Sequence, residues 1–162
     1  MRTDYIYSII LFFPLLIIQT TIVPLVAIDG AVPDLILIML VFYTIRNGQV
    51  YGTVLGFIYG FIFDLITGSF LGSTMLSKTL AGFLAGYFYN ENRLESNFKS
   101  LVFSLIVLLC ASVDSVIYTF ITQIDSSSSL FSLLIEQGMI PGIYTALLSF
   151  VVVIFYPQRS IN

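Results

Sequence analysis

Apolar residues follow one another in long runs along most of this chain, and short groups of polar or turn-forming residues separate the runs. Residues within a run such as 35–42 (LILIMLVF) do not alternate between apolar and polar, so the strands of a membrane β-barrel are not expected. Unbroken apolar runs of this length are typical of helices buried in lipid or protein. We therefore predict an all-α protein with helices at about 5–28, 31–46, 48–66, 70–90, 98–122 and 130–156.

The second of these helices is the shortest. Its apolar run covers only 35–46, which at 1.5 Å per residue gives about 18 Å, less than the ~30 Å of a bilayer's hydrocarbon core. It spans only if it begins near Ala31, or if it is a broken or tilted element. Pro33 and Asp34 suit the start of a helix, because proline is tolerated in the first turn and the helix dipole favours a carboxylate there.

The composition indicates that lipid, and not water, surrounds most of the surface of the protein. Of the 162 residues, 58% are hydrophobic and 9% are charged, whereas soluble domains carry roughly a quarter charged residues. A spanning helix needs about 20 apolar residues, so the chain has room for six spans and short connections. We expect residues 1–162 to form a single polytopic integral membrane domain.

Composition also excludes several functional classes. The net charge of −3 argues against nucleic acid as a partner, since nucleic acid requires a basic surface. The chain has no His and one cysteine, Cys110, which we interpret as a small buried apolar residue. Cys/His metal clusters and His-activated nucleophiles are therefore ruled out. A metal or acid–base site made of carboxylates alone stays open, but we expect no catalytic residues, no metal and no cofactor.

The distribution of charge predicts the orientation. With six spans, five of the six basic residues fall at one side of the membrane; they are Arg2, Arg46, Arg93, Lys99 and Arg159. The connections expected on the other side, at 29–34, 67–69 and 123–129, contain Asp29, Asp34 and Asp125 but no Lys or Arg. Because basic residues mark the cytoplasmic side, we expect both termini to be cytoplasmic.

Glycines recur every four residues in the third and fourth helices. The third carries Gly48, Gly52, Gly56 and Gly60, and the fourth carries Gly82 and Gly86. Residues at this spacing form one ridge along a helix, and small residues let helices approach closely in lipid. We predict a tight hairpin of the third and fourth helices, packed along these glycines.

Four ionisable residues fall within predicted spans: Asp64, Lys78, Asp114 and Glu136. Lys78 and Asp114 lie at matching depth, about 12 Å from the outer helix ends, and are expected to pair, with Asp64 and Glu136 as neighbours. Two interpretations stay open. The cluster is either an internal polar clasp that fixes helix register, or a cavity or partner-binding groove open to the outer face.

Three segments then resemble the MreD family of bacterial rod shape-determining membrane proteins. They are Pro33–Leu37 (PDLIL), Arg46–Gly48 (RNG) and Gly56–Leu65 (GFIYGFIFDL), and Leu71-Gly72, Lys78, Ala81-Gly82 and Gly86-Tyr87 continue the match. Region 98–162 adds only its hydropathy.

The resemblance implies a non-enzymatic scaffold of the cell-elongation machinery in the bacterial cytoplasmic membrane. It implies binding to MreC, a bitopic membrane protein, and indirect association with MreB filaments, RodA and penicillin-binding protein 2, and so a role in cell shape and peptidoglycan synthesis. The implied fold is similar to the six-helix substrate-binding components of energy-coupling-factor transporters.

Two other functions compete with the scaffold. In a small-molecule (vitamin-type) binding component of a transporter, the four ionisable residues would line an outward-open pocket. An intramembrane enzyme of lipid chemistry would require acidic residues towards the cytoplasm, whereas these lie towards the other face, so it ranks last.

Overall fold

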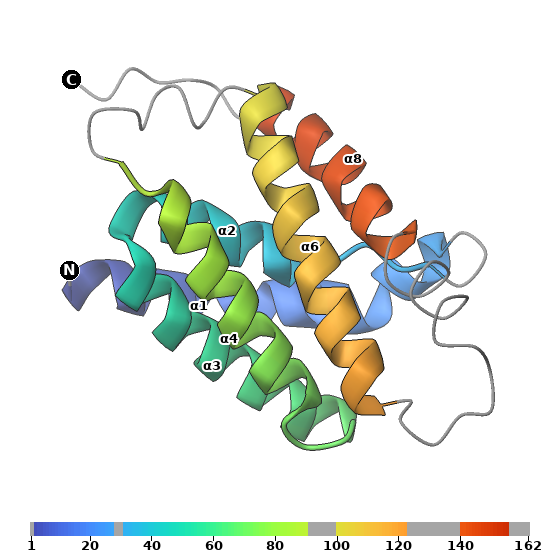
Figure 1. Cartoon of the computed structure of the whole chain (residues 1–162). Coiled ribbons are helices and arrows are strands. Elements are labelled where there is room, and N and C mark those ends of the chain that lie inside the picture. Colours follow the sequence, from blue (N-terminus) through green and yellow to red (C-terminus); the bar gives the residue numbers. More distant parts are fainter. Residues whose placement is uncertain (1, 28–30, 91–99, 123–139, 156–162) are drawn as a thin grey trace.

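The computed structural model describes residues 2–27, 31–90, 100–122 and 140–155 (Figure 1). These residues form six α-helices and two short 3₁₀ helices. The elements are α1 (Arg2–Thr21), η1 (Val23–Val26), α2 (Leu35–Asn47), α3 (Gln49–Thr67), α4 (Ser73–Ala85), η2 (Gly86–Phe88), α6 (Ser100–Thr122) and α8 (Ile140–Phe155). The helices pack into one bundle, in which α3 lies along α4, α4 contacts α6, and α6 lies along α8 (Figure 1).

Three of the predicted helices are shorter in the structure. The first was predicted to reach residue 28, but α1 ends at Thr21 and a 3₁₀ turn containing Pro24 follows, since proline lacks the N–H that would continue the helix. The fourth was predicted over 70–90, but α4 covers only Ser73–Ala85. Gly72 precedes it with a φ of +105°, a left-handed conformation that breaks the helical path.

The second helix begins at Leu35 and not at the predicted residue 31. Asp34 is its N-cap: the backbone there is extended, and the side chain accepts a hydrogen bond from the Leu37 N–H. α2 therefore has 13 residues, a length of about 20 Å. By contrast, α3 agrees with the prediction within one residue, α6 ends where predicted, and residues 130–139 of the predicted last helix lie outside the described residues.

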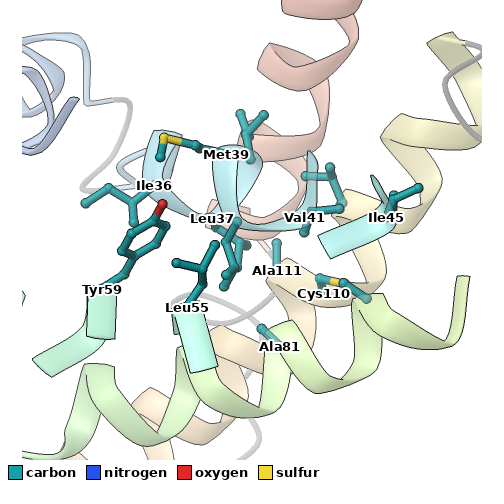
Figure 2. Packing of buried hydrophobic residues seen from close by; sticks show 14 of the residues in the cluster. Ile36, Leu37, Met39, Val41, Ile45, Leu55, Tyr59, Ala81, Cys110 and Ala111 are labelled. Atoms are coloured by element: carbon teal, nitrogen blue, oxygen red, sulfur yellow. The ribbon is translucent and has the colours of Figure 1, made fainter. Parts of the chain in front are cut away.

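This short helix α2 is the centre of the bundle. Its residues from Ile36 to Val41 are all buried in succession, so no face of this stretch is left for solvent. It contacts α1, α3, α4, α6 and α8. Figure 2 shows its side chains packed among Leu55 and Tyr59 of α3, Ala81 of α4, and Cys110 and Ala111 of α6.

The closest helix pair is α3 with α4, and glycines form the contact. A Cβ placed on Gly56 would lie 2.2 Å from the backbone oxygen of Lys78, and one on Gly60 would lie 2.4 Å from the Cα of Met75. Gly52 and Gly82 face each other, since a Cβ on Gly82 would lie 2.3 Å from the Gly52 oxygen. Each of these positions is too tight for any side chain, so the two backbones touch directly.

Gly48 does not belong to this ridge. It lies in the turn between α2 and α3 with a φ of +99°, and the nearest atoms to an added Cβ are those of the Tyr89 ring, at 3.7 Å or more. A glycine is favoured there by the left-handed backbone and not by helix packing. Gly86 does make a tight contact, because its Cβ would lie 2.3 Å from the Cα of Gln49.

The outer surface of the bundle is apolar. Large hydrophobic side chains are exposed on the helices that surround α2, among them Leu25 at 83%, Val50 at 77% and Leu101 at 69%. Such a continuous apolar exterior is unsuited to water. Within the described residues, Gln49–Thr67 and Leu101–Thr122 are long and apolar enough to cross a membrane by length and composition alone, and the apolar helices Tyr5–Thr21, Leu35–Asn47 and Ile140–Val151 are shorter.

The backbone contact between α3 and α4 predicts a strong effect of one methyl group. Gly56→Ala should lower the free energy of unfolding by about 1–3 kcal/mol, the usual cost of overpacking, because the Lys78 carbonyl cannot move without separating the helices. Gly142→Ala in α8 is the matched control, since the nearest neighbours of its added Cβ are atoms of Ser112 at 3.6 Å. Thermal unfolding of both variants in detergent tests this, and equal midpoints would contradict it.

Candidate functional site

Three charged side chains meet between α2, α4 and α6. Lys78 of α4 donates a hydrogen bond to Oδ2 of Asp34, and its Nζ lies 3.3 Å from Oδ2 of Asp114 on α6. The Lys78 side chain is 3% exposed, that of Asp114 12% and that of Asp34 25%. We call this set the Asp34–Lys78–Asp114 triad. It joins three helices that are far apart in the sequence.

Backbone geometry holds Asp34 in place for this contact. Its Oδ1 accepts a hydrogen bond from the Leu37 N–H at 2.9 Å, which leaves Oδ2 for Lys78. Its own N–H donates to the hydroxyl oxygen of Thr145 on α8 at 3.0 Å. The Gln19 side chain of α1 bonds both neighbours, donating to the Pro33 carbonyl and accepting from the Leu35 N–H, each at 2.9 Å. Side chains of α1 and α8 thus supply hydrogen-bond partners for the backbone at residues 33–35.

Asp34 is the residue of the site that sequence analysis missed. It was assigned only to the start of the second helix, while Lys78 was paired with Asp114. That predicted pair is present in the structure, but Asp34 is the nearer partner of Lys78. The sequence did contain a signal for this contact. Asp34 starts a helix on the side of the membrane where the expected connections carry only acidic residues, and a lysine side chain is long enough to reach it.

Asp64 was predicted to neighbour this cluster, and the structure corrects that. Its carboxylate accepts hydrogen bonds from the Ser69 hydroxyl at 2.9 Å and from the backbone N–H groups of Gly72, Thr74 and Met75 at 2.9–3.2 Å. These are the free N–H groups at the start of α4, where the helix dipole favours a negative charge. Asp64 therefore closes the α3–α4 turn from the end of α3. Glu136, the other predicted neighbour, lies outside the described residues.

The face of α4 that carries Lys78 is polar over its first half. Ser73, Thr74 and Ser77 are buried there, with exposures of 4% or less, whereas the second half of this helix buries Ala81, Gly82 and Ala85. The Ser73 and Ser77 hydroxyls donate to the carbonyls of Phe70 and Thr74. Sequence analysis did not select these serines and this threonine, although their spacing with Lys78 places them on one side of a helix.

Paired charges inside and apolar side chains outside are the reverse of a water-soluble protein. Among the described residues no group of three or more His, Cys, Asp or Glu side chains is placed to hold a metal ion. The Lys78 ammonium and the Asp34 carboxylate satisfy each other and offer no free nucleophile. The fold and this site define a helical membrane protein stabilised by an internal ion-pair network.

The comparisons with known proteins place the chain within that class. The family model described as rod shape-determining protein MreD matches residues 1–159 of the 162-residue chain. The chain therefore belongs to the MreD family, and its role lies in determining the rod shape of cells. No curated protein and no solved structure matches it.

The triad predicts that removing its one cation is costly. Lys78→Met leaves the acidic groups of Asp34 and Asp114 without a counter-ion and should lower the free energy of unfolding by about 3–5 kcal/mol. Adding Asp34→Asn should recover part of this loss, because one stranded charge is removed.

Denaturation in mixed micelles measures the free energy of unfolding of both variants. Arg46→Met is the control, since Arg46 is exposed and lies 5.7 Å from the centre of the Phe42 ring, a contact worth about 0.5–1 kcal/mol at exposed sites. If Lys78→Met costs no more than Arg46→Met, the triad does not stabilise the bundle.

Proposed function

We propose that this chain is a non-enzymatic scaffold of the bacterial cell-elongation complex, which binds an MreC-type bitopic membrane protein. Through that partner it supports the regulation of cell shape and peptidoglycan synthesis, in indirect association with MreB filaments, RodA and penicillin-binding protein 2. The family match over residues 1–159 is the observation that carries this proposal.

The proposal includes a location and a topology. We place residues 1–162 in the cytoplasmic membrane as one domain with six spans and both termini in the cytoplasm. Hydrogen bonds at one end of the bundle support alternating helix directions. Gln19 near the end of α1 bonds Pro33 just before α2 and Leu35 at its first position, and Thr145 in the first half of α8 bonds Asp34. The fold similarity to energy-coupling-factor substrate-binding components belongs to the proposal as well.

The geometry favours a scaffold over a small-molecule binding component. A binding pocket would need its charged residues to face an open cavity. Lys78 is instead buried and paired with Asp34 and Asp114, and Asp64 is bonded to the backbone at the start of α4. Charges that satisfy one another fix helix register, whereas the exposed apolar faces are the surfaces left for other membrane helices.

Partner recovery tests the scaffold function. The tagged full chain, expressed at native level and extracted in mild detergent, should co-purify the MreC-type protein, and depletion should turn rod-shaped cells round. Gly142→Ala should restore both properties to depleted cells, while Lys78→Met should restore them less well in proportion to its loss of folded protein. Failure to recover the MreC-type protein, together with normal shape after depletion, would exclude the proposed function.

Reporter fusions test the topology separately. Green fluorescent protein fused after Asn162 should fluoresce, and alkaline phosphatase at the same position should be inactive, because the carboxyl terminus is expected in the cytoplasm. Alkaline phosphatase inserted after Ser69, in the α3–α4 turn, should be active. The opposite pattern at Asn162 would mean an odd number of crossings or the reverse orientation.

A further inference from the structure

The Asp34–Lys78–Asp114 triad contains one base and two acids, so with all three ionised it carries one negative charge in excess. The groups that face it from the surrounding helices do not balance this charge. α8 contributes the uncharged Thr145 hydroxyl, and α6 contributes Cys110, which lies one turn before Asp114 and is buried. Among the described side chains, Lys78 is the one cation that contacts either acid.

The two acids are not equivalent. Both oxygens of Asp34 have partners, Oδ2 with Lys78 and Oδ1 with the Leu37 N–H, and its side chain is a quarter exposed. The Asp114 side chain is only 12% exposed, and only its Oδ2 faces Lys78, at 3.3 Å. Its Oδ1 is buried and has no hydrogen-bond partner among the residues that the structure describes. The unbalanced charge therefore falls on Asp114.

A buried carboxylate oxygen without a partner is unstable as an anion. Removing an ion from water costs several kcal/mol even after relaxation of the protein, and a group in that position takes up a proton instead. A neutral carboxyl group has an O–H to donate. The buried Ser77 hydroxyl, next to Lys78 on α4, already donates to the Thr74 carbonyl, so its oxygen has lone pairs left to accept.

We propose that Asp114 is a proton-binding site, and that the folded triad at neutral pH consists of a Lys78–Asp34 ion pair beside a neutral Asp114 carboxyl group. The excess charge of the triad is then zero. Asp34 is the counter-ion of Lys78, and Asp114 holds an exchangeable proton between α4 and α6. This inference rests on burial and contacts within the chain and is independent of the proposed partner.

Infrared spectroscopy of the purified full chain in lipid nanodiscs tests it, because the C=O stretch of a protonated carboxyl group is separate from the bands of a carboxylate. At neutral pH the wild-type chain should show a protonated-carboxyl band that shifts when aspartate is labelled with ¹³C at its side-chain carboxyl. Asp114→Asn should abolish the band. Asp64→Asn, the control outside the triad, should leave it unchanged.

Asp34→Asn gives a second, opposite test. With Asp34 neutral, Asp114 becomes the sole counter-ion of Lys78 and should ionise, so the band should disappear although Asp114 itself is intact. A wild-type spectrum without a label-sensitive band overturns the proposal without any variant, and so does a band that survives Asp114→Asn. Because partner recovery is not used, failure here is distinct from failure of the scaffold function.

Discussion

The buried ammonium group of Lys78 limits how the helices of this bundle can be arranged. A positive charge enclosed by apolar helices has to be neutralised by a group of the chain itself, and Asp34 at the start of α2 does so, while Asp114 of α6 lies on the other side of the same ammonium group. The same residue is fixed through its backbone, since its carbonyl oxygen lies against Gly56 of α3. Lys78 therefore connects the closest helix contact of the bundle to its most polar one.

These two connections explain why α2 is central although it is short. The N-cap of this helix must reach Lys78, and its apolar side chains then fill the space between α3, α4 and α6 (Figure 2). Asp34 serves both needs, because one of its oxygens starts the helix and the other neutralises the lysine.

Sequence reasoning predicted the local features well and the long-range ones less well. Apolar runs placed all the described α-helices, and four-residue glycine spacing predicted that α3 and α4 lie together, because both signals are contained within single helices. The contacts of Asp34 and Asp64 were missed for a common reason. Each carboxylate bonds backbone groups of a turn or helix start, at Leu37 and at Gly72–Met75, and such bonds depend on where the chain leaves the helical path. Span counting treats that path as continuous, so Asp64 was grouped with the other ionisable residues in the outward half of the membrane.

The Thr145 hydroxyl that receives the Asp34 N–H lies 111 positions further along the chain, in the last described helix. A ribosome has therefore synthesised the chain as far as residue 145 before the Asp34 N–H can find this partner. Until then, a backbone N–H beside the triad lacks its final partner, and α2 lacks one of the helices around it. Termination before residue 145 would consequently leave a defect near residue 34, far from the break in the sequence, where quality-control proteases would meet an unfinished core.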